Sequence, residues 1–355
     1  MSARTKQILR AVVGLALAVA LLGWGFPKVA QTTWSEVFGQ LEQVTPWESL
    51  GFGALVLVGL GCYTFTFTGS LPGLSQWRAF IVNICGSSVS NLLPGGGAVG
   101  LAATYTILRS WGFKNRDVST SAIVTGVWNT LARIALPIVA IVMLWFGNDG
   151  LPRSLTSAAW AATVSGLAIF AAFVAILASE RAAQSIGRGL DRVLGPLFRR
   201  RKRTMSVSEL VHDMRGRINE VVRTGWVQMT LGMIGFFGFY YLLFVLIMRT
   251  VGVDMLPLGI LFAAFAIGRL LTAVGVTPGG VGVTEIASVA ALVGWGASPE
   301  AAAAGIFLFS IFTHLMEVPL GALGWLVWSM SPRIKGATGD DDDPADKEAT
   351  QPATP

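Results

Sequence analysis

Charged residues are scarce in this sequence. Of its 355 residues only 13% are Asp, Glu, Lys or Arg, against about 25% in soluble domains. Hydrophobic residues make up 53%, and the mean hydropathy is +0.63. This composition excludes a soluble globular domain and indicates a membrane protein that crosses the bilayer several times. The net charge of +6 does not indicate nucleic-acid binding, because most basic residues lie between hydrophobic segments.

Cysteine and histidine are equally rare, with two of each. Cys62 and Cys85 lie inside apolar segments, which excludes a disulfide framework and a CxxC motif. His212 and His314 are not part of an HExxH motif. The sequence also lacks a nucleophile–base pair, an acidic metal cluster and a GK[ST] phosphate loop. We therefore predict a protein without metal or cofactor that is not an enzyme.

Long apolar segments are the dominant feature of the chain. Each is near the roughly 20 residues that a helix needs to cross a bilayer. They cover residues 9–27, 51–69, 118–146, 155–178, 224–248 and 301–329. The first follows Arg4, Lys6 and Arg10 and resembles a signal peptide. A signal peptide needs a small residue just before its cleavage site, but Lys28 occupies that position at the best candidate site. We therefore expect this segment to remain uncleaved as a membrane anchor.

Two further apolar regions, 78–110 and 257–296, are interrupted by Pro-Gly-Gly. Their second arms, Ala98–Ser110 and Val283–Gly294, are too short to span a membrane at about 1.5 Å per residue. Each region therefore predicts a re-entrant hairpin. The expected fold is an all-α polytopic integral membrane protein with about eight membrane segments.

The distribution of Lys and Arg predicts the orientation. Basic residues gather at the N-terminus and in the long loop before residue 224, which contains the run Arg199–Arg203. The positive-inside rule then places both termini in the cytoplasm, in a bacterial-type cytoplasmic membrane. In the same loop, Ser206 and Glu209 form a capping-box pattern ahead of apolar residues at helical spacing. This pattern indicates a helix that lies on the membrane surface or binds a partner.

The domain division follows from these segments. We predict a membrane domain over residues 1–330 and a disordered acidic cytoplasmic tail over 331–355. The membrane domain divides into three parts: repeat one at about 51–178, a cytoplasmic basic loop at 179–223, and repeat two at about 224–330.

An internal repeat relates the two interrupted regions. Pro94 precedes Trp111 by 17 residues, and Pro278 precedes Trp295 by 17 residues. Each tryptophan is followed by glycine and then by a long apolar segment. Under the predicted topology the first hairpin enters from the cytoplasm and the second from outside, so the repeats are inverted. Non-helical backbone at this depth must be satisfied by protein or water, and two opposed tips therefore predict a polar cavity.

Ionisable residues inside the apolar segments are the first candidates for its lining, because such residues usually face an interior or an aqueous pathway. Arg133 and Glu317 each lie 39 residues after the proline of their repeat, so they are equivalent positions with opposite charge. They form either a structural ion pair or a substrate-facing pair. The predicted cavity residues are Arg133, Arg269, Glu285, His314, Glu317 and Asn91.

Each of the remaining candidates has two interpretations. Glu285 lies in the first turn of the returning helix, where it either caps backbone N–H groups or binds a cationic headgroup or a proton. His314 is one turn from Glu317 and is either packed or functional. Arg269 either complements Glu285 or holds a phosphate. Asn91 either caps backbone groups or lines the cavity.

The glycines of the hairpin tips form the second group of candidates. Their N–H groups at helix starts are suited to a lipid phosphate, and the alternative is that they allow tight turns and close helix packing. The stretch GGGAVG fits G-x-G-x-x-G, but no strand precedes it, which excludes dinucleotide binding. The predicted tips consist of Pro94, Gly95, Gly96, Gly97, Pro278, Gly279, Gly280 and Gly282.

The motifs TPGGVGVTE (277–285) and NLLPGGG (91–97), together with the basic central loop, resemble the lysylphosphatidylglycerol synthase transmembrane-region family over residues 8–330. The best-known members of this family are the multiple peptide resistance factors. The resemblance implies that the corresponding region of those proteins flips aminoacylated phosphatidylglycerol, a lipid that a separate cytosolic domain makes. We expect a stand-alone member without that synthase domain. Thr284 stands where members often carry a basic residue, and Glu317 where they tend to be apolar, so the headgroup is expected to differ.

The predicted function is translocation of a phospholipid or lipid-linked headgroup through the cavity. The sequence leaves open the headgroup, the energy source, passive scrambling and homo-oligomer formation. One alternative is an ion- or proton-coupled transporter of a small solute, in which Glu285 and His314 couple transport. Another is an accessory subunit or enzyme of polyprenyl-linked sugar metabolism. The expected partners are membrane lipids, namely an anionic or aminoacylated phospholipid or a polyprenyl-phosphate lipid.

Overall fold

The computed structural model of the chain describes residues 23–24, 28, 31–93, 96–146, 207–272, 277 and 280–332, without the side chains of 207–217. Every regular element of this described part is helical. Several predictions fall outside it: the apolar segments 9–27 and 155–178, the basic run Arg199–Arg203 and the tail beyond residue 332. The tip residues Pro94, Gly95, Pro278 and Gly279 also lie outside it.

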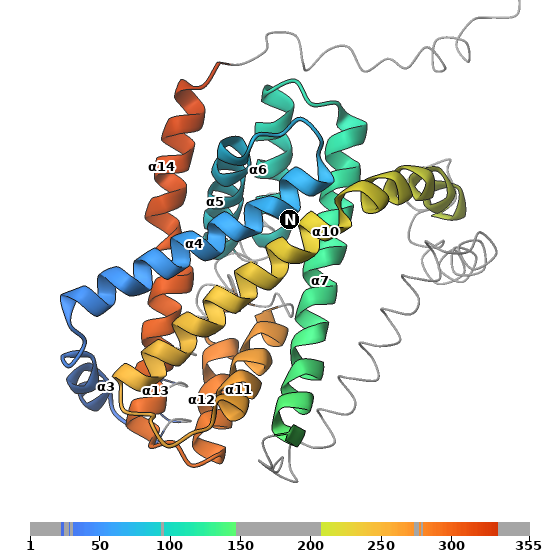
Figure 1. Cartoon of the computed structure of the whole chain (residues 1–355). Coiled ribbons are helices and arrows are strands. Elements are labelled where there is room, and N and C mark those ends of the chain that lie inside the picture. Colours follow the sequence, from blue (N-terminus) through green and yellow to red (C-terminus); the bar gives the residue numbers. More distant parts are fainter. Residues whose placement is uncertain are drawn as a thin grey trace, which may run out of the picture.

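Four long helices are apolar enough to cross a membrane (Figure 1). They confirm the four predicted spans that fall in the described part. They are α4 (Pro46–Ser70), α7 (Asn115–Phe146), the Ile218–Thr250 part of α10 (Val207–Thr250), and a helix from Pro299 to Met330. The last consists of α13 (Pro299–Ser310), the π-helix η4 (Ile311–Leu315) and α14 (Glu317–Met330).

Helix α10 differs from the expectation in one respect. The capping-box pattern correctly predicts a helix that begins after Ser206, but this helix does not end before the membrane span. Val207–Thr250 is one helix of 44 residues. No proline interrupts the sequence between the two predicted parts, so the backbone hydrogen bonds continue through them. The surface helix and the span are therefore one element.

Two pairs of shorter helices occupy the interrupted regions. The first pair is α5 (Gln76–Leu92) with α6 (Gly96–Ser110), and the second is α11 (Leu258–Leu271) with α12 (Val283–Gly294). The helices of each pair pack against each other. Figure 1 shows α5 and α6 toward one end of the molecule and α11 and α12 toward the opposite end, beside the long helix α7.

Local sequence explains where these short helices begin and end. Leu93 is extended, with φ −113° and ψ 136°, as expected for the residue before a proline. Helix α5 therefore ends at Leu92. In the second pair, Gly280 and Gly282 have φ of 80° and 92°, which residues with a Cβ rarely adopt. Gly282 is the N-cap of α12, so this turn depends on glycine.

The long helices exchange partners between the two halves. Helix α4 packs on α10, α14 packs on α5, and α7 packs on α11. Small residues allow close approach at these contacts. A Cβ on Gly225 of α10 would lie 2.0 Å from the carbonyl oxygen of Gly69 on α4. A Cβ on Gly321 of α14 would lie 2.1 Å from the side chain of Ser88 on α5. Each half is therefore held by a helix of the other.

Aromatic side chains at the ends of long helices are exposed. Trp47 at the start of α4 is 81% exposed, and Trp145 and Phe146 at the end of α7 are 80% and 84% exposed. Such residues anchor helices at the membrane interface. A short helix outside the spans, α3 (Trp34–Leu41), packs on α13 through Trp34 and Phe307, whose ring centroids are 5.1 Å apart. These features fit a multi-pass membrane protein.

Candidate functional site

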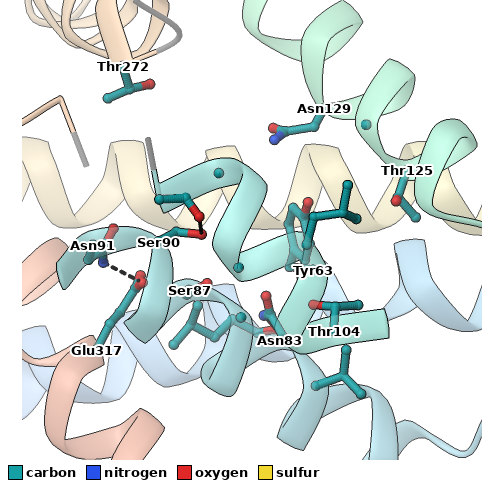
Figure 2. A pocket seen from close by; sticks show the side chains of 18 of the residues that line it. Tyr63, Asn83, Ser87, Ser90, Asn91, Thr104, Thr125, Asn129, Thr272 and Glu317 are labelled. Atoms are coloured by element: carbon teal, nitrogen blue, oxygen red, sulfur yellow. Dashed lines mark hydrogen bonds between the residues drawn. The ribbon is translucent and has the colours of Figure 1, made fainter. Parts of the chain in front are cut away.

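A cavity of about 710 Å³ lies between the two helix pairs and the long helices. Residues of α4, α5, α6, α7, α10, α11, η4 and α14 line it, together with residues of the loop before α12. Five of the predicted cavity residues meet here, although they come from both halves of the chain. They are Asn91, Arg133, Arg269, His314 and Glu317. Figure 2 shows the polar side chains of α5 and α7 around this space.

Glu317 is buried at the start of α14, and both its oxygens are engaged by the protein. The Asn91 side chain on α5 donates to Oε2 at 3.0 Å (Figure 2). The Tyr240 hydroxyl on α10 donates to Oε1 at 3.0 Å. Burial of a carboxylate is costly unless hydrogen bonds satisfy it. Asn91 and Tyr240 satisfy it here and join α5, α10 and α14.

Arg133 finds its partners on α7 and α11. Its Nε donates to the Asn129 Oδ1 at 3.2 Å, and its Nη1 donates to the backbone carbonyl of Arg269 at 3.1 Å. Arg133 and Glu317 thus line the same cavity, but their hydrogen bonds go to other residues. The interpretation as a direct ion pair between equivalent positions gains no support from these contacts.

Arg269 is 9% exposed and lies among aromatic rings. Its guanidinium carbon is 4.9 Å from the ring centroid of Phe309, 5.6 Å from that of Phe265 and 5.7 Å from that of Tyr240. These distances are within the range of cation–π attraction. None of the described residues supplies a hydrogen-bond acceptor to this guanidinium. It is a buried cation whose five N–H donors have no acceptor within the described part of the chain.

Glu285 does not line the large cavity. It is 1% exposed and borders a separate pocket of about 20 Å³, which Arg269 and His314 also border. Its Oε2 accepts from the backbone N–H of Gly282 at 2.5 Å and from the Thr284 hydroxyl at 2.9 Å. Its Oε1 accepts from the Ser310 hydroxyl at 2.5 Å. The carboxylate therefore caps α12, as the first of the two interpretations predicts.

His314 belongs to the π-helix η4, which interrupts the last long helix beside the cavity. Short π-helical turns inside α-helices are frequent at functional sites. The Nδ1 of His314 is 3.2 Å from the Thr313 hydroxyl, and its backbone carbonyl accepts from the Asn91 side chain at 3.5 Å. The π turn thus brings a backbone acceptor and an imidazole to the wall of the cavity.

The tip glycines that the structure describes differ in their surroundings. Gly96, Gly97 and Gly280 line the cavity. A Cβ on Gly96 would lie 2.0 Å from the carbonyl oxygen of Ser90, whereas a Cβ on Gly97 would meet nothing within 4 Å. Gly96 therefore serves close packing of α5 and α6, and the Gly97 position borders open space.

Two polar stripes line the cavity, and apart from Asn91 and Arg133 we did not predict their residues. Residues four apart lie on one face of a helix, and both stripes face the cavity. Asn83, Ser87 and Asn91 form the stripe on α5; Ser121, Thr125 and Asn129 form the stripe on α7, which ends at the charged Arg133. The four-residue spacing was the signal that could have identified them. Their amide and hydroxyl groups offer both donors and acceptors.

A sequence model of the family described as "Lysylphosphatidylglycerol synthase TM region" matches residues 11–321. This match covers both short-helix pairs, both glycine motifs and every residue that lines the cavity. A search of curated proteins finds no match to the chain.

Proposed function

Because the chain belongs to the lysylphosphatidylglycerol synthase transmembrane-region family, we propose that it translocates the headgroup of a phospholipid or lipid-linked molecule across the membrane. The family is linked to lipid handling, and its transmembrane region is the flippase part rather than the catalytic part. We accordingly propose that this chain is a transporter of lipids and not an enzyme. The membrane would be the cytoplasmic membrane, with both termini in the cytoplasm.

The polar cavity is the observation that carries this proposal. A charged headgroup cannot enter hydrocarbon without a cost of several kcal/mol, about 2.5–3.5 for one charged side chain at the bilayer centre. A cavity of about 710 Å³ that holds two arginines and many neutral polar groups lowers this cost. Its volume falls in the range of about 300–1,000 Å³ that small-molecule sites occupy. The headgroup would cross inside the cavity while the acyl chains stay in lipid.

We further propose that the two short-helix pairs are the re-entrant hairpins of inverted repeats. Two observations support this. The pairs lie toward opposite ends of the molecule (Figure 1), and each packs on a long helix of the other half. Transporters with such repeats open alternately to the two sides by a relative motion of the repeats. A cavity lined from both halves is suited to that motion.

The experiment is a translocation measurement with purified protein in vesicles. Fluorescent phosphatidylglycerol is placed in both leaflets, and dithionite destroys the label in the outer leaflet only. We expect vesicles with protein to lose more fluorescence than protein-free vesicles, because inner-leaflet lipid reaches the outer leaflet. The same measurement is made with aminoacylated phosphatidylglycerol and with a polyprenyl-phosphate lipid. If vesicles with protein lose no more fluorescence than protein-free vesicles for any of the three lipids, the proposal is contradicted.

Two other outcomes would favour the alternative functions. Uptake of a small solute that depends on a proton gradient, without lipid movement, would favour a coupled transporter with Glu285 and His314 as its coupling groups. Formation of a product from a polyprenyl-linked sugar by the pure protein would favour a membrane enzyme.

A further inference from the structure

The charges that remain unsatisfied in the cavity restrict the headgroup that it accepts. A cationic group in a buried site is costly unless a partner compensates its charge, and a carboxylate that is free to pair with it is the strongest such partner. Glu317 is the acidic residue among those that line the cavity. Its two oxygens already accept from Asn91 and Tyr240, each at 3.0 Å. An amine would have to displace one of these donors and leave it without a partner.

Glu285 is no better placed to bind an amine. It lies outside the lining of the large cavity. Its oxygens accept from Gly282, Thr284 and Ser310 at 2.5, 2.9 and 2.5 Å. These contacts fix the start of α12. Both acids of the region therefore serve the protein itself.

The arginines have the opposite character. Arg133 and Arg269 line the same cavity, and the Nη1 of Arg133 reaches the backbone carbonyl of Arg269 at 3.1 Å. Arg269 is held among Tyr240, Phe265 and Phe309, and the described residues provide no acceptor for its N–H groups. Two guanidinium groups with spare donors are suited to a phosphate, which accepts paired N–H bonds.

The rest of the polar lining is neutral. The neutral stripe on α7 runs from Ser121 to Asn129, about 12 Å at 1.5 Å per residue, and the stripe on α5 runs from Asn83 to Asn91. Serine, threonine and asparagine side chains both donate and accept, as hydroxyl groups of a ligand do. A headgroup beyond the phosphate would therefore meet partners for hydroxyls along α7 and α5 (Figure 2).

We propose that the cavity selects a phosphate ester whose headgroup is uncharged and rich in hydroxyls, as in phosphoglycerol, inositol phosphate or a sugar phosphate, and discriminates against a headgroup with an amine. The proposal rests on the proposed function and specifies its substrate class. It departs from the aminoacylated lipid that the family's description suggests.

The test compares labelled lipids in vesicles that contain the full chain. We use phosphatidylglycerol, phosphatidylinositol and lysylphosphatidylglycerol, with protein-free vesicles as the baseline. We expect the first two to move at least about tenfold faster than the lysyl lipid, which corresponds to about 1.4 kcal/mol. Equal or faster movement of the lysyl lipid would overturn this inference and leave the proposed function intact. Movement of none of the three lipids, together with no uptake of a free phosphate ester, would overturn both.

A second arm separates a lipid headgroup from a free phosphate ester. Uptake of radiolabelled glycerol phosphate or inositol phosphate into the same vesicles is measured. Uptake without movement of any lipid would support the recognised chemistry and overturn the lipid function. Faster movement of the lipids than of the free esters would support both.

Two variants test the argument about Glu317 directly. Asn91→Ala removes the donor to Oε2, and Tyr240→Phe removes only the hydroxyl that donates to Oε1. Each should raise the rate of the lysyl lipid relative to phosphatidylglycerol, because an oxygen of the carboxylate becomes free. Tyr241→Phe is the matched control, since that hydroxyl donates to the backbone carbonyl of Leu258. An unchanged ratio in Tyr240→Phe, which preserves the ring, would contradict the proposal.

Discussion

At the scale of single residues, the buried charges of this protein divide into two kinds. The carboxylates of Glu285 and Glu317 are enclosed by protein donors, whereas the guanidinium of Arg269 lies against aromatic rings and has no hydrogen-bond acceptor within the described part of the chain. Satisfied groups stabilise the fold, and unsatisfied ones are available to a ligand. Substitutions should separate these two roles.

Glu285 should affect stability more than transport. Glu285→Ala leaves the N–H of Gly282 and the hydroxyl of Ser310 without their acceptor, and we expect a loss of about 1–3 kcal/mol. Glu285→Gln keeps one oxygen for the cap and should cost about 1 kcal/mol or less. Thermal unfolding in detergent measures both variants. If Glu285→Gln unfolds like wild type but moves no lipid, the carboxylate takes part in transport.

Arg269 should show the opposite pattern. Arg269→Gln removes the charge that faces the cavity but breaks no hydrogen bond of that side chain to the described residues. We expect the translocation rate of phosphatidylglycerol to fall at least about tenfold, a change of about 1.4 kcal/mol. Thermal stability should fall by about 2 kcal/mol or less, because only the cation–π contacts with the aromatic rings are lost. Arg223→Gln, at an exposed position of α10, is the control and should move lipid like wild type. A rate near wild type in Arg269→Gln would contradict the phosphate-binding role.

At the scale of helices, close packing depends on a few glycines. Gly225→Ala would place a Cβ 2.0 Å from the backbone of Gly69 and force α4 and α10 apart. We expect a loss of stability of about 1–3 kcal/mol, as for other overpacked interiors. Gly238→Ala is the matched control on the same helix, because nothing lies within 4 Å of its Cβ. It should be neutral or stabilise by up to about 1 kcal/mol. The midpoint of thermal unfolding should therefore be lower for Gly225→Ala than for Gly238→Ala. Equal midpoints would show that α4 and α10 can move apart at little cost.

The small helix α3 should respond to pH. The backbone N–H of Thr33 donates to Glu36 at 2.7 Å, and the hydroxyls of Thr32 and Thr33 donate at 2.9 Å. These bonds hold the pKa of Glu36 below its ordinary value of 4.5. Because the folded pKa is lowered, the cap contributes stability above that value and loses it as pH falls through the folded pKa.

Hydrogen exchange of the α3 amides, corrected for the intrinsic rate, should therefore show more opening as pH falls from about 6 to about 3. Glu36→Gln should open more at pH 6 and lose most of this dependence. Glu42→Gln, at the C-cap of the same helix, should keep the dependence of wild type. A pH response in Glu36→Gln as large as that of wild type would assign it to another group.

Helices could be predicted from the sequence more completely than their contacts. The apolar segments and Pro-Gly-Gly breaks predict the four spans and the short helices, because length and backbone breakers act locally. The predicted arm Val283–Gly294 is helix α12. The polar stripes were also readable at four-residue spacing, but single Ser, Thr and Asn residues are common in packed membrane helices. The contact of Tyr240 with Glu317 could not be predicted, because the two residues lie 77 positions apart in the sequence.

At the scale of the whole molecule, the proposal of inverted repeats makes the depth of the hairpin tips the decisive quantity. Helix α6 has 15 residues, which gives about 22 Å at 1.5 Å per residue, less than the roughly 30 Å of a hydrocarbon core. A re-entrant pair therefore leaves its tip within the membrane, beside the cavity. Two full crossings would instead place that tip on the outer surface. Both arrangements leave the ends of the pair on the cytoplasmic side, so only the tip distinguishes them.

Gly97→Cys tests this depth, because a Cβ there meets nothing within 4 Å. The variant is made after Cys62 and Cys85 are replaced by alanine, and intact cells are treated with a membrane-impermeant maleimide. Met255→Cys, in the turn between α10 and α11 and 92% exposed, should be labelled from outside, and Lys114→Cys should not. If the first pair re-enters from the cytoplasm, Gly97→Cys reacts far more slowly than Met255→Cys, since its tip is reached only through the cavity. Labelling of Gly97→Cys as fast as Met255→Cys would mean that both arms cross the bilayer, and the two helix pairs would then have to form the cavity as complete spans.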